Sequence, residues 1–247
     1  MKLAENILIG FRPIIEAVNA GKEIEKVLFK SGSTGELYHE TFDLVRKNNI
    51  PFQVVPIEKL NRITRKNHQG IIAFVSVIEY SNIENLLPSL FENSVNPLIV
   101  MLDQVSDVRN FGAIARSAEC AGANAIIVAE KGMAQINYDA IKTSAGALLK
   151  IPVCRTKSMM KTVDFVKNSG LKVFASTEKA SINIYDADFS VPTAIILGSE
   201  EKGISNDLLC NSDELVKIPI LGTVESLNVS VAASVVLYEA IRQRLYK

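Results

Sequence analysis

The chain has 247 residues, 48% of them hydrophobic and 22% charged, and its 27 basic and 27 acidic side chains give a net charge of zero. This composition is that of a globular protein and excludes a disordered or collagen-like chain. No apolar stretch nears the roughly 18 residues that a bilayer span needs, so we expect a soluble, cytoplasmic protein. At about 150 residues per domain, the length allows one large domain or a small domain and a larger one.

The net charge is zero, but the charged side chains are distributed unevenly along the chain. Residues 1–78 carry eleven basic and eight acidic side chains, a net of +3, whereas residues 79–94 carry three acidic side chains and no basic one. Residues 95–247 carry sixteen of each sign. A protein that binds nucleic acid over much of its surface is usually strongly basic. Any phosphate-binding face is therefore expected to be a local patch.

The first 78 residues alternate helix-like and strand-like segments, which predicts a small α/β domain. Residues 79–96 are polar and acidic with apolar insertions, which indicates a linker that contains one short helix. The expected helices of the small domain are 11–20, 36–48 and 57–63, and its expected strands are 26–30, 52–55 and 71–78.

Residues 97–247 alternate apolar runs with helical segments, which is typical of a parallel sheet covered on both faces. The last helix is apolar on most sides, which indicates a core helix or a helix covered by a partner subunit. The small residues at 143–147 are expected to let another segment approach closely. The expected strands are 98–102, 125–129, 173–176, 194–197 and 215–220, and the expected helices are 112–121, 138–148, 159–168, 205–210 and 229–245.

The three cysteines, Cys120, Cys154 and Cys210, are widely spaced and odd in number. Neither a disulfide framework nor a zinc ribbon is expected from them. We expect three small buried hydrophobic side chains instead.

Three polar loops follow expected strands, at the carboxyl ends where parallel sheets bind ligands. The first contains Asn110 and enters a helix expected to begin near Gly112, with Arg116 one turn inside it. The second, 197–204, contains two glycines that permit close backbone approach and two acids that would repel phosphate. The third contains Ser226 and Asn228. Taken singly, each loop is equally well interpreted as a strand-to-helix turn with capping residues.

A basic cluster precedes the expected strand at 71–78. Its cations are accompanied by three amide side chains, which is the mixture that contacts splayed RNA loops. The alternative interpretation is a solvated helix end, and a lone histidine in such a cluster is more often structural than functional. The members are Arg62, Arg65, Lys66 and His68, with Asn61, Asn67 and Gln69.

In combination and in order, the three loops resemble the motifs of a known family. N-x-G-x-x-x-R, L-G-x-E-x-x-G and I-P-x-x-G-x-x-x-S-L-N-V-S-x-A-A, spread over residues 97–245, are similar to those of the SpoU (TrmH) RNA 2′-O-ribose methyltransferases, of the SPOUT superfamily. Residues 10–18 and 67–71 resemble the L30e-like substrate-binding domain that precedes the catalytic domain in many members. The architecture is most similar to bacterial enzymes that methylate a guanosine ribose in 23S rRNA, although Phe11-Arg12-Pro13-Ile14 departs from their usual G-x-x-A/P-V.

The resemblance implies an L30e-like α/β domain over residues 1–78, a linker over 79–96 and a methyltransferase domain over 97–247. The second domain would be a parallel-sheet α/β domain with its C-terminal segment threaded into a trefoil knot. It would bind S-adenosyl-L-methionine and form a homodimer through the C-terminal helix. The implied partner is RNA, with no membrane and no metal.

The resemblance also assigns residues. The catalytic positions would be Asn110, Arg116, Glu200, Ser226 and Asn228. The cofactor positions would be Thr177, Gly198, Ile218 and Leu227, and the RNA contacts Arg62, Arg65, Lys66 and His68.

Methyl transfer to a ribose hydroxyl is an in-line displacement, so the protein must align the reacting groups and help the hydroxyl lose its proton. Arg116 would lose its own proton in a desolvated site or stabilise the developing alkoxide. Two other functions stay open, a transfer RNA ribose methyltransferase and a non-catalytic RNA-binding paralogue. A nucleotide-dependent oxidoreductase is disfavoured because no G-x-G-x-x-G follows a strand.

Overall fold

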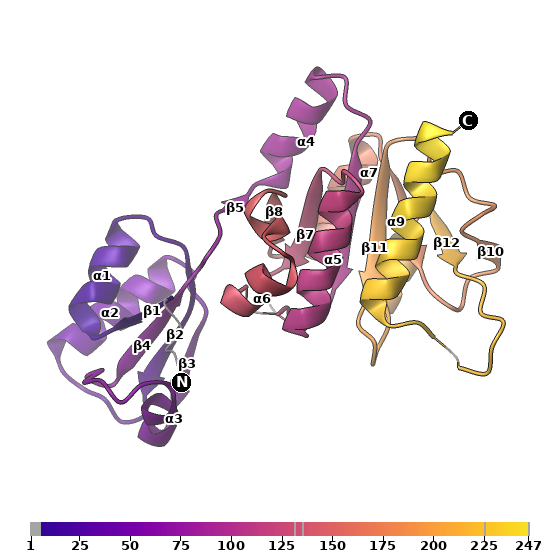
Figure 1. The fold of residues 1–247 in the computed structure, drawn as a ribbon. Coiled ribbons are helices and arrows are strands. Elements are labelled where there is room, and N and C mark those ends of the chain that lie inside the picture. The colour runs from indigo at the N-terminus through magenta and orange to yellow at the C-terminus, as the bar shows by residue number, and fades with distance from the viewer. Residues whose placement is uncertain (1–5, 131, 135, 225, 247) are drawn as a thin grey trace. The chain divides into compact units, whose positions relative to one another are not determined.

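The computed structural model describes residues 6–130, 132–134, 136–224 and 226–246 (Figure 1). The chain divides into two compact units, of which the first ends at Glu79 and the second begins at Tyr80. Within the described ranges, no helix combines the length and the apolar character that crossing a membrane would need.

The first unit is a four-stranded mixed sheet with three helices. Its strand order is β1-β4-β2-β3, and β2 pairs antiparallel with β4 and parallel with β3. Alternate residues of β2 enter two cores, because Val27 and Phe29 pack with helices α1 and α2 while Leu28 packs with Leu60 of α3. The elements are β1 (Ile7–Ile9), α1 (Phe11–Asn19), β2 (Ile24–Lys30), α2 (Glu36–Lys47), β3 (Phe52–Val55), α3 (Ile57–Ile63) and β4 (Ile71–Val75).

The second unit is an eight-stranded sheet in which all strand pairs among the described residues are parallel, which confirms the predicted sheet type. The strand order is β10-β12-β9-β11-β6-β7-β8-β5. The strands are β5 (Tyr80–Ser81), β6 (Leu98–Asp103), β7 (Ala125–Ala129), β8 (Val153–Thr156), β9 (Lys172–Ser176), β10 (Ile182–Asn183), β11 (Thr193–Gly198) and β12 (Glu214–Lys217).

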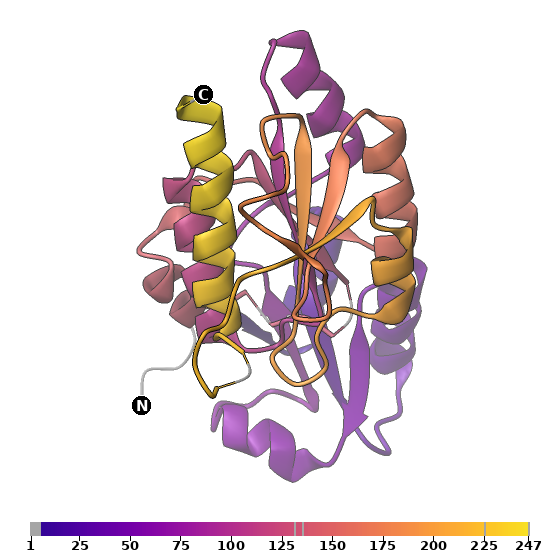
Figure 2. The same ribbon diagram turned by 90° about the vertical axis from the view of Figure 1, so that its right-hand side faces the viewer.

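Helices cover both faces of this sheet, so its central strands are buried on both sides (Figure 2). One face packs against α4, α7 and α8 through side chains such as Ile99 and Met101 of β6. Helices α5, α6 and α9 pack together away from that core. The helices are α4 (Ile83–Glu92), α5 (Val108–Cys120), α6 (Tyr138–Thr143), the 3-10 turn η1 (Ala147–Leu149), α7 (Met159–Asn168), α8 (Asn206–Asn211) and α9 (Val229–Leu245).

The segment expected as a linker, 79–96, contains both β5 and α4. β5 pairs with β8, and Leu87 of α4 is fully buried in the core of the second unit. Asn82 caps α4 by accepting the N–H of Glu84. This segment therefore contributes a strand and a helix to the second unit.

The prediction of a helix over 138–148 is wrong for its second half. Helix α6 ends at Thr143 because Ala145 and Gly146 have φ values of 51° and 84°, outside the helical region. The close approach expected at this segment is confirmed by Gly112 of α5, where a Cβ atom would lie 2.8 Å from the Cβ of Thr143. Only glycine allows helix α5 to pack this closely on α6.

The expectation that all three cysteines are buried holds for only one of them. Cys154 is buried in β8, and this burial raises the pKa of its thiol to about 11. Cys120, the last residue of α5, and Cys210, in α8, are both exposed. Each lies near the end of a helix, where the apolar pattern does not fix which face is covered.

Helix α9 packs along α5, and the hydroxyl oxygens of Ser117 and Ser234 lie 2.7 Å apart between them. Arg244 anchors the C-terminal end of the helix because its guanidinium donates to four backbone carbonyls at 2.8–3.0 Å. The acceptors belong to Asn96, Pro97, Phe189 and Val191. Burial lowers the pKa of Arg244.

Candidate functional site

Four neighbouring strands of the second sheet end at one edge, and the three polar loops start there. The strands β12, β9, β11 and β6 lie side by side and run parallel, so their carboxyl ends meet. The loops that follow them are 104–107, 177–181, 199–205 and 218–228. This edge is where parallel α/β sheets bind ligands.

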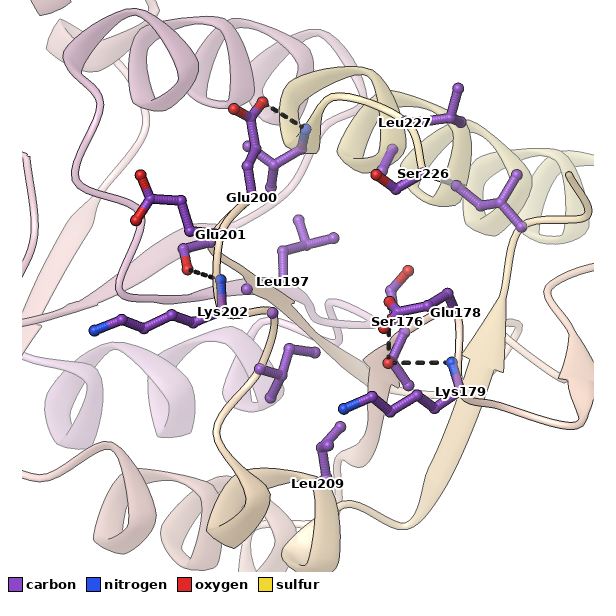
Figure 3. A pocket seen from close by; sticks show the side chains of 18 of the residues that line it. Ser176, Glu178, Lys179, Leu197, Glu200, Glu201, Lys202, Leu209, Ser226 and Leu227 are labelled. Carbon is purple, nitrogen blue, oxygen red and sulfur yellow. Dashed lines mark hydrogen bonds between the residues drawn. The ribbon is translucent and has the colours of Figure 1, made fainter. Parts of the chain in front are cut away.

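A hollow of about 360 Å³ lies among these loops (Figure 3). Ser226 and Leu227 lie on the segment before α9, and Glu178 and Lys179 lie on the loop after β9. The apolar part of the lining includes Leu197, Ile204, Leu209, Ile218, Ile220 and Leu227. The polar part includes Ser176, Thr177, Glu178, Lys179, Ser199, Glu200 and Ser226.

The four positions that the resemblance assigns to the cofactor all line this hollow. Thr177 is buried, with its backbone N–H donating to the carbonyl of Val216 at 2.9 Å. Gly198 ends β11, while Ile218 and Leu227 belong to the segment that follows β12. Side chains separated by fifty residues of sequence are therefore brought to one cavity by the order of the strands.

The loop after β11 is closed tightly on itself. A Cβ atom at Gly198 would lie 2.1 Å from the carbonyl carbon of Gly203, so the two backbone segments touch. The N–H of Gly203, where φ is +67°, donates to the carbonyl of Ser199 at 2.9 Å. Both glycines are thus required, the first by close approach and the second by its left-handed conformation.

Asp103 holds the far end of this loop, and sequence reasoning did not single it out. It is the last residue of β6 and is buried, and its carboxylate accepts the N–H of Ser205 at 2.8 Å. In the sheet, Asp103 also pairs with Gly198. An acid at the end of a fully apolar strand was the signal available in the sequence, because a buried carboxylate needs donors.

Three of the predicted catalytic residues form one hydrogen-bonded group. The side-chain amide of Asn228 donates to Oδ1 of Asn110 at 3.0 Å and also to Oε1 of Glu200. Oε1 of Glu200 accepts the N–H of Val229 as well, at 3.4 Å. Asn228 Oδ1 accepts the N–H of Ser230 and so caps α9. The group joins the first turn of α5 to the loops that follow β11 and β12.

Helix α5 begins four residues earlier than expected. The side chain of Asp107 accepts the N–H groups of Arg109 and Asn110 at 2.9 and 2.8 Å, which starts the helix at Val108. Asn110 therefore lies in the first turn of the helix and not in the preceding loop. The expected start near Gly112 is wrong because the glycine serves contact with α6 instead.

Arg116 is not part of the hydrogen-bonded group. At about 100° and 1.5 Å per residue, six residues place it roughly 120° around α5 from Asn110 and about 9 Å along the axis. Its side chain is exposed and has no hydrogen bond or ion pair within the described part of the chain. Because α5 begins at Val108, Arg116 lies about two turns inside the helix, and the expectation that it lies one turn inside is wrong.

The basic cluster of the first unit lies around a separate hollow of about 390 Å³. Arg65 and Lys66 line it and are exposed, and Lys30 of β2 joins them. Arg62, in the last turn of α3, is exposed but is not part of the lining.

His68 differs from the other members of this cluster because its side chain is buried. Its Nδ1 accepts the N–H of Gly70 at 3.1 Å, so Nε2 carries the proton and donates to Oδ1 of Asn61 at 3.0 Å. Both ring nitrogens are thus engaged inside the unit. The position favours a structural role in the loop over the expected RNA contact.

Comparison with known proteins identifies both units. Residues 97–238 match the SpoU rRNA methylase family, and residues 7–81 match the substrate-binding region of RNA 2′-O-ribose methyltransferases. The chain is 30% identical to a Bacillus subtilis protein assigned to the TrmH family of tRNA/rRNA methyltransferases, over 99% of this chain and 98% of that one. A Staphylococcus aureus protein of the same description is 32% identical over 98% of both chains.

Solved structures give the same result for the fold. The SpoU methyltransferase AviRb from Streptomyces viridochromogenes, in complex with AdoMet, superposes with a TM-score of 0.62 at 26% identity, over 98% of this chain and 91% of that one. A structure described as an RNA 2′-O ribose methyltransferase gives 0.58 at 29% identity, over 97% and 88%. By its matched regions and its relatives, the chain belongs to the SpoU (TrmH) family of RNA 2′-O-ribose methyltransferases.

Proposed function

We propose that this protein transfers the methyl group of S-adenosyl-L-methionine to the 2′-hydroxyl of a guanosine in 23S rRNA. The observation that carries the proposal is the hydrogen-bonded group of Asn110, Glu200 and Asn228, of which Glu200 lines the same hollow as the cofactor positions. The relative with bound AdoMet supports the choice of cofactor, and the two-unit architecture supports ribosomal RNA. We expect the protein to act in the cytoplasm.

The residues around the hollow fit this cofactor. A volume of about 360 Å³ lies within the range of small-molecule pockets, which combine an apolar lining with a few polar groups. Ile218, Ile220 and Leu227 would cover the adenine ring, while the polar groups of Thr177 and Ser226 would bind the ribose and amino-acid parts. When bound, the cofactor supplies an electrophilic methyl carbon on a sulfonium centre.

The protein's own residues would then align the acceptor hydroxyl with that carbon. Asn228 lies at the start of α9 and donates to both Asn110 and Glu200, so the three side chains are already hydrogen-bonded to one another without RNA. Alignment of reacting groups is worth on the order of 7–11 kcal/mol. We assign Ser226, which lines the same hollow, to orientation of the hydroxyl or the cofactor.

As a charged guanidinium, Arg116 would stabilise the alkoxide that develops on the ribose. Alternatively, Arg116 would first release its own proton in a desolvated site, and the neutral side chain would then accept the proton of the hydroxyl. Because Arg116 lies on another face of α5 from Asn110, we propose that it serves the site of a second copy of the chain. Helix α9, which packs on α5, exposes apolar side chains that a homodimer would cover. They include Val231, Tyr238 and Leu245.

The first unit would bind the RNA. Lys30, Arg65 and Lys66 place three cations around its hollow, and cationic and amide side chains together suit a single-stranded RNA loop. A trefoil knot in the second unit remains an expectation from the family resemblance.

The proposal is tested by mapping ribose methylation in RNA from cells that lack this protein. One guanosine of 23S rRNA is expected to lose its methyl group, and purified protein with S-adenosyl-L-methionine is expected to restore it. Loss confined to a transfer RNA would favour the second candidate, which the tRNA/rRNA description of the relatives supports. Unchanged methylation in every RNA would favour a non-catalytic RNA-binding protein.

A further inference from the structure

A second hollow, of about 320 Å³, shares a wall with the hollow assigned to the cofactor. The shared wall consists of residues 199–202 and Val229. The remaining lining comes from the loop after β6, the start of α5 and the segment after β7. These residues are Gln104, Val105, Ser106, Asp107, Asn110 and Gly132.

The position of this second hollow suits the methyl acceptor. In-line transfer requires the acceptor oxygen to lie about 3–3.5 Å from the methyl carbon, so the acceptor must enter through a space that adjoins the cofactor. Asn110 lines the second hollow, and Glu200 lines both hollows. We propose that the second hollow holds the nucleoside whose ribose is methylated, and that Glu201 recognises its base as guanine. This inference rests on the proposed function.

The charges of the lining decide which part of a nucleotide fits there. Three carboxylates, those of Asp107, Glu200 and Glu201, face one amine, that of Lys202. An acidic lining repels a phosphate but accepts hydrogen bonds from a neutral base or sugar. The second hollow therefore suits a nucleoside rather than its phosphates.

Two of the three carboxylates already accept hydrogen bonds from the protein itself. Asp107 accepts two backbone N–H groups at the start of α5, and Glu200 accepts from Asn228 and Val229. Glu201 is exposed and has no hydrogen-bond or ion-pair partner within the described ranges. In Figure 3 its side chain points to the side of the loop away from Glu178 and Lys179. Glu201 is thus the carboxylate that remains free to bind a ligand.

A free carboxylate distinguishes the four bases by their donors. The Watson–Crick edge of guanine places N1–H and the N2 amino group side by side, so one carboxylate accepts both hydrogen bonds. Adenine and cytosine place a ring acceptor beside their amino group, and uracil offers one N–H between two carbonyls. Enzymes that act on an extruded nucleotide read this edge. Gln104 lines the same hollow and carries an amide N–H that suits the O6 of guanine.

The test combines a protein variant with a base analogue. Labelled S-adenosyl-L-methionine and the full-length protein are incubated with total RNA from cells that lack the protein, and the labelled nucleoside and its position are identified. The segment around that position is then synthesised with guanosine or with inosine, which lacks the 2-amino group but keeps N1–H. Wild type and Glu201→Gln are compared on both RNAs. Asp207→Asn serves as the matched control, because Asp207 is an exposed acid of α8 that lines neither hollow.

We expect 2′-O-methylguanosine as the labelled product. Glu201→Gln should lower kcat/KM on the guanosine RNA about tenfold or more, with an unchanged Kd for S-adenosyl-L-methionine, and Asp207→Asn should match wild type. Inosine should slow wild type about tenfold but slow Glu201→Gln less than threefold, because the variant has already lost the contact.

An unchanged kcat/KM for Glu201→Gln, or an equal inosine effect in both proteins, would overturn the inference and leave the proposed function intact. Label in another nucleoside would overturn the inference and also the choice of guanosine in the proposed function, while ribose methylation itself would stand. An absence of label in any RNA would instead overturn the proposed function, and the inference with it.

Discussion

Asn228 ties the start of helix α9 to helix α5, because its side-chain amide donates to Oδ1 of Asn110 at 3.0 Å across 118 residues of sequence. The same amide donates to Glu200, and Oδ1 of Asn228 accepts the N–H of Ser230 at 2.9 Å. One side chain therefore caps α9 and also joins the start of α5 to the loop after β11. These two roles can be separated by substitution.

Asn228→Ser should preserve the cap of α9 but remove the side-chain contacts to Asn110 and Glu200. A serine oxygen still caps α9, so the free energy of unfolding should stay near that of wild type, whereas Asn228→Ala should lose about 0.5–2 kcal/mol. Neither short side chain reaches Asn110 and Glu200, so both variants should methylate RNA about 100-fold more slowly. Thermal unfolding and single-turnover methylation measure the two effects. A wild-type rate for Asn228→Ser would show that the contacts to Asn110 and Glu200 do not matter.

Arg116→Ala and Asn228→Ala should each methylate RNA about 100-fold more slowly than wild type when alone, and part of the activity should return when the two variants are mixed. If Arg116 serves the site of a second copy, a mixed dimer contains one site with both an intact Asn228 and an intact Arg116. Methylation should then recover to as much as about a quarter of wild type, because random mixing makes half of the dimers mixed and each has one good site. Recovery is measured after unfolding and refolding the mixture. No recovery, in a mixture shown to contain mixed dimers, would place Arg116 in the site of its own chain.

Asp103→Ala should weaken binding of S-adenosyl-L-methionine about tenfold or more. The variant leaves the N–H of Ser205 without its buried acceptor, so the loop 199–205 loses its anchor on β6. Asp103→Asn keeps an acceptor oxygen and should restore most of the affinity. Titration calorimetry measures Kd, and urea unfolding checks that both variants are folded. Equal affinities for wild type and Asp103→Ala would show that the hydrogen bond does not support the loop.

The double variant Arg65→Ala/Lys66→Ala should raise KM for RNA and leave the affinity for S-adenosyl-L-methionine unchanged. Each lost phosphate contact should also reduce the slope of log K against log salt by about 0.7 for a single strand. Filter binding at several salt concentrations measures the slope. Lys47→Ala, at the last residue of α2, is the control because Lys47 does not line the hollow of the first unit. An unchanged slope in the double variant would exclude Arg65 and Lys66 from the RNA interface.

Glu239→Gln should lower stability at neutral pH but not in acid. The hydrogen bond from Arg242 lowers the pKa of the Glu239 carboxyl, and a second from Gln243 adds to it, although burial acts in the opposite direction. Because the folded pKa is lowered, the stabilisation is complete above the unfolded value near 4.5 and is lost as the pH falls through the folded pKa. Urea unfolding between about pH 3 and pH 7 measures it. A constant difference over this range would indicate lost packing instead of lost charge.

The parallel sheet of the second unit was predictable because its central strands are continuous apolar runs. β6 is buried at all six positions, so its sequence carries a signal that needs no tertiary information. The three loops were found for the same reason, since polar residues stand out where such a run ends. Asp103 was missed although it marks that boundary, because its partner Ser205 lies 102 residues away.

Predictions from the local sequence are wrong where contact with a distant segment determines the position of a residue. The sequence predicts that a helix begins near Gly112, whereas the missing side chain of this glycine allows contact with Thr143, and the residue that starts the helix is the capping Asp107. His68 has the sequence context of an RNA contact, but the packing of its loop against Asn61 buries it. Burial of a single polar residue depends on the assembled fold and cannot be read from spacing.

The contrast among the three cysteines makes the second unit convenient for spectroscopy. Cys120 and Cys210 are exposed, on helices α5 and α8, whereas Cys154 is buried and its thiol has a pKa of about 11. Helix α8 packs against one face of the sheet, and α5 lies outside that core. A maleimide fluorophore or nitroxide will therefore attach at these two native positions without engineered cysteines. The distance between the two labels, measured with and without ligand, reports whether α5 moves relative to α8 on binding.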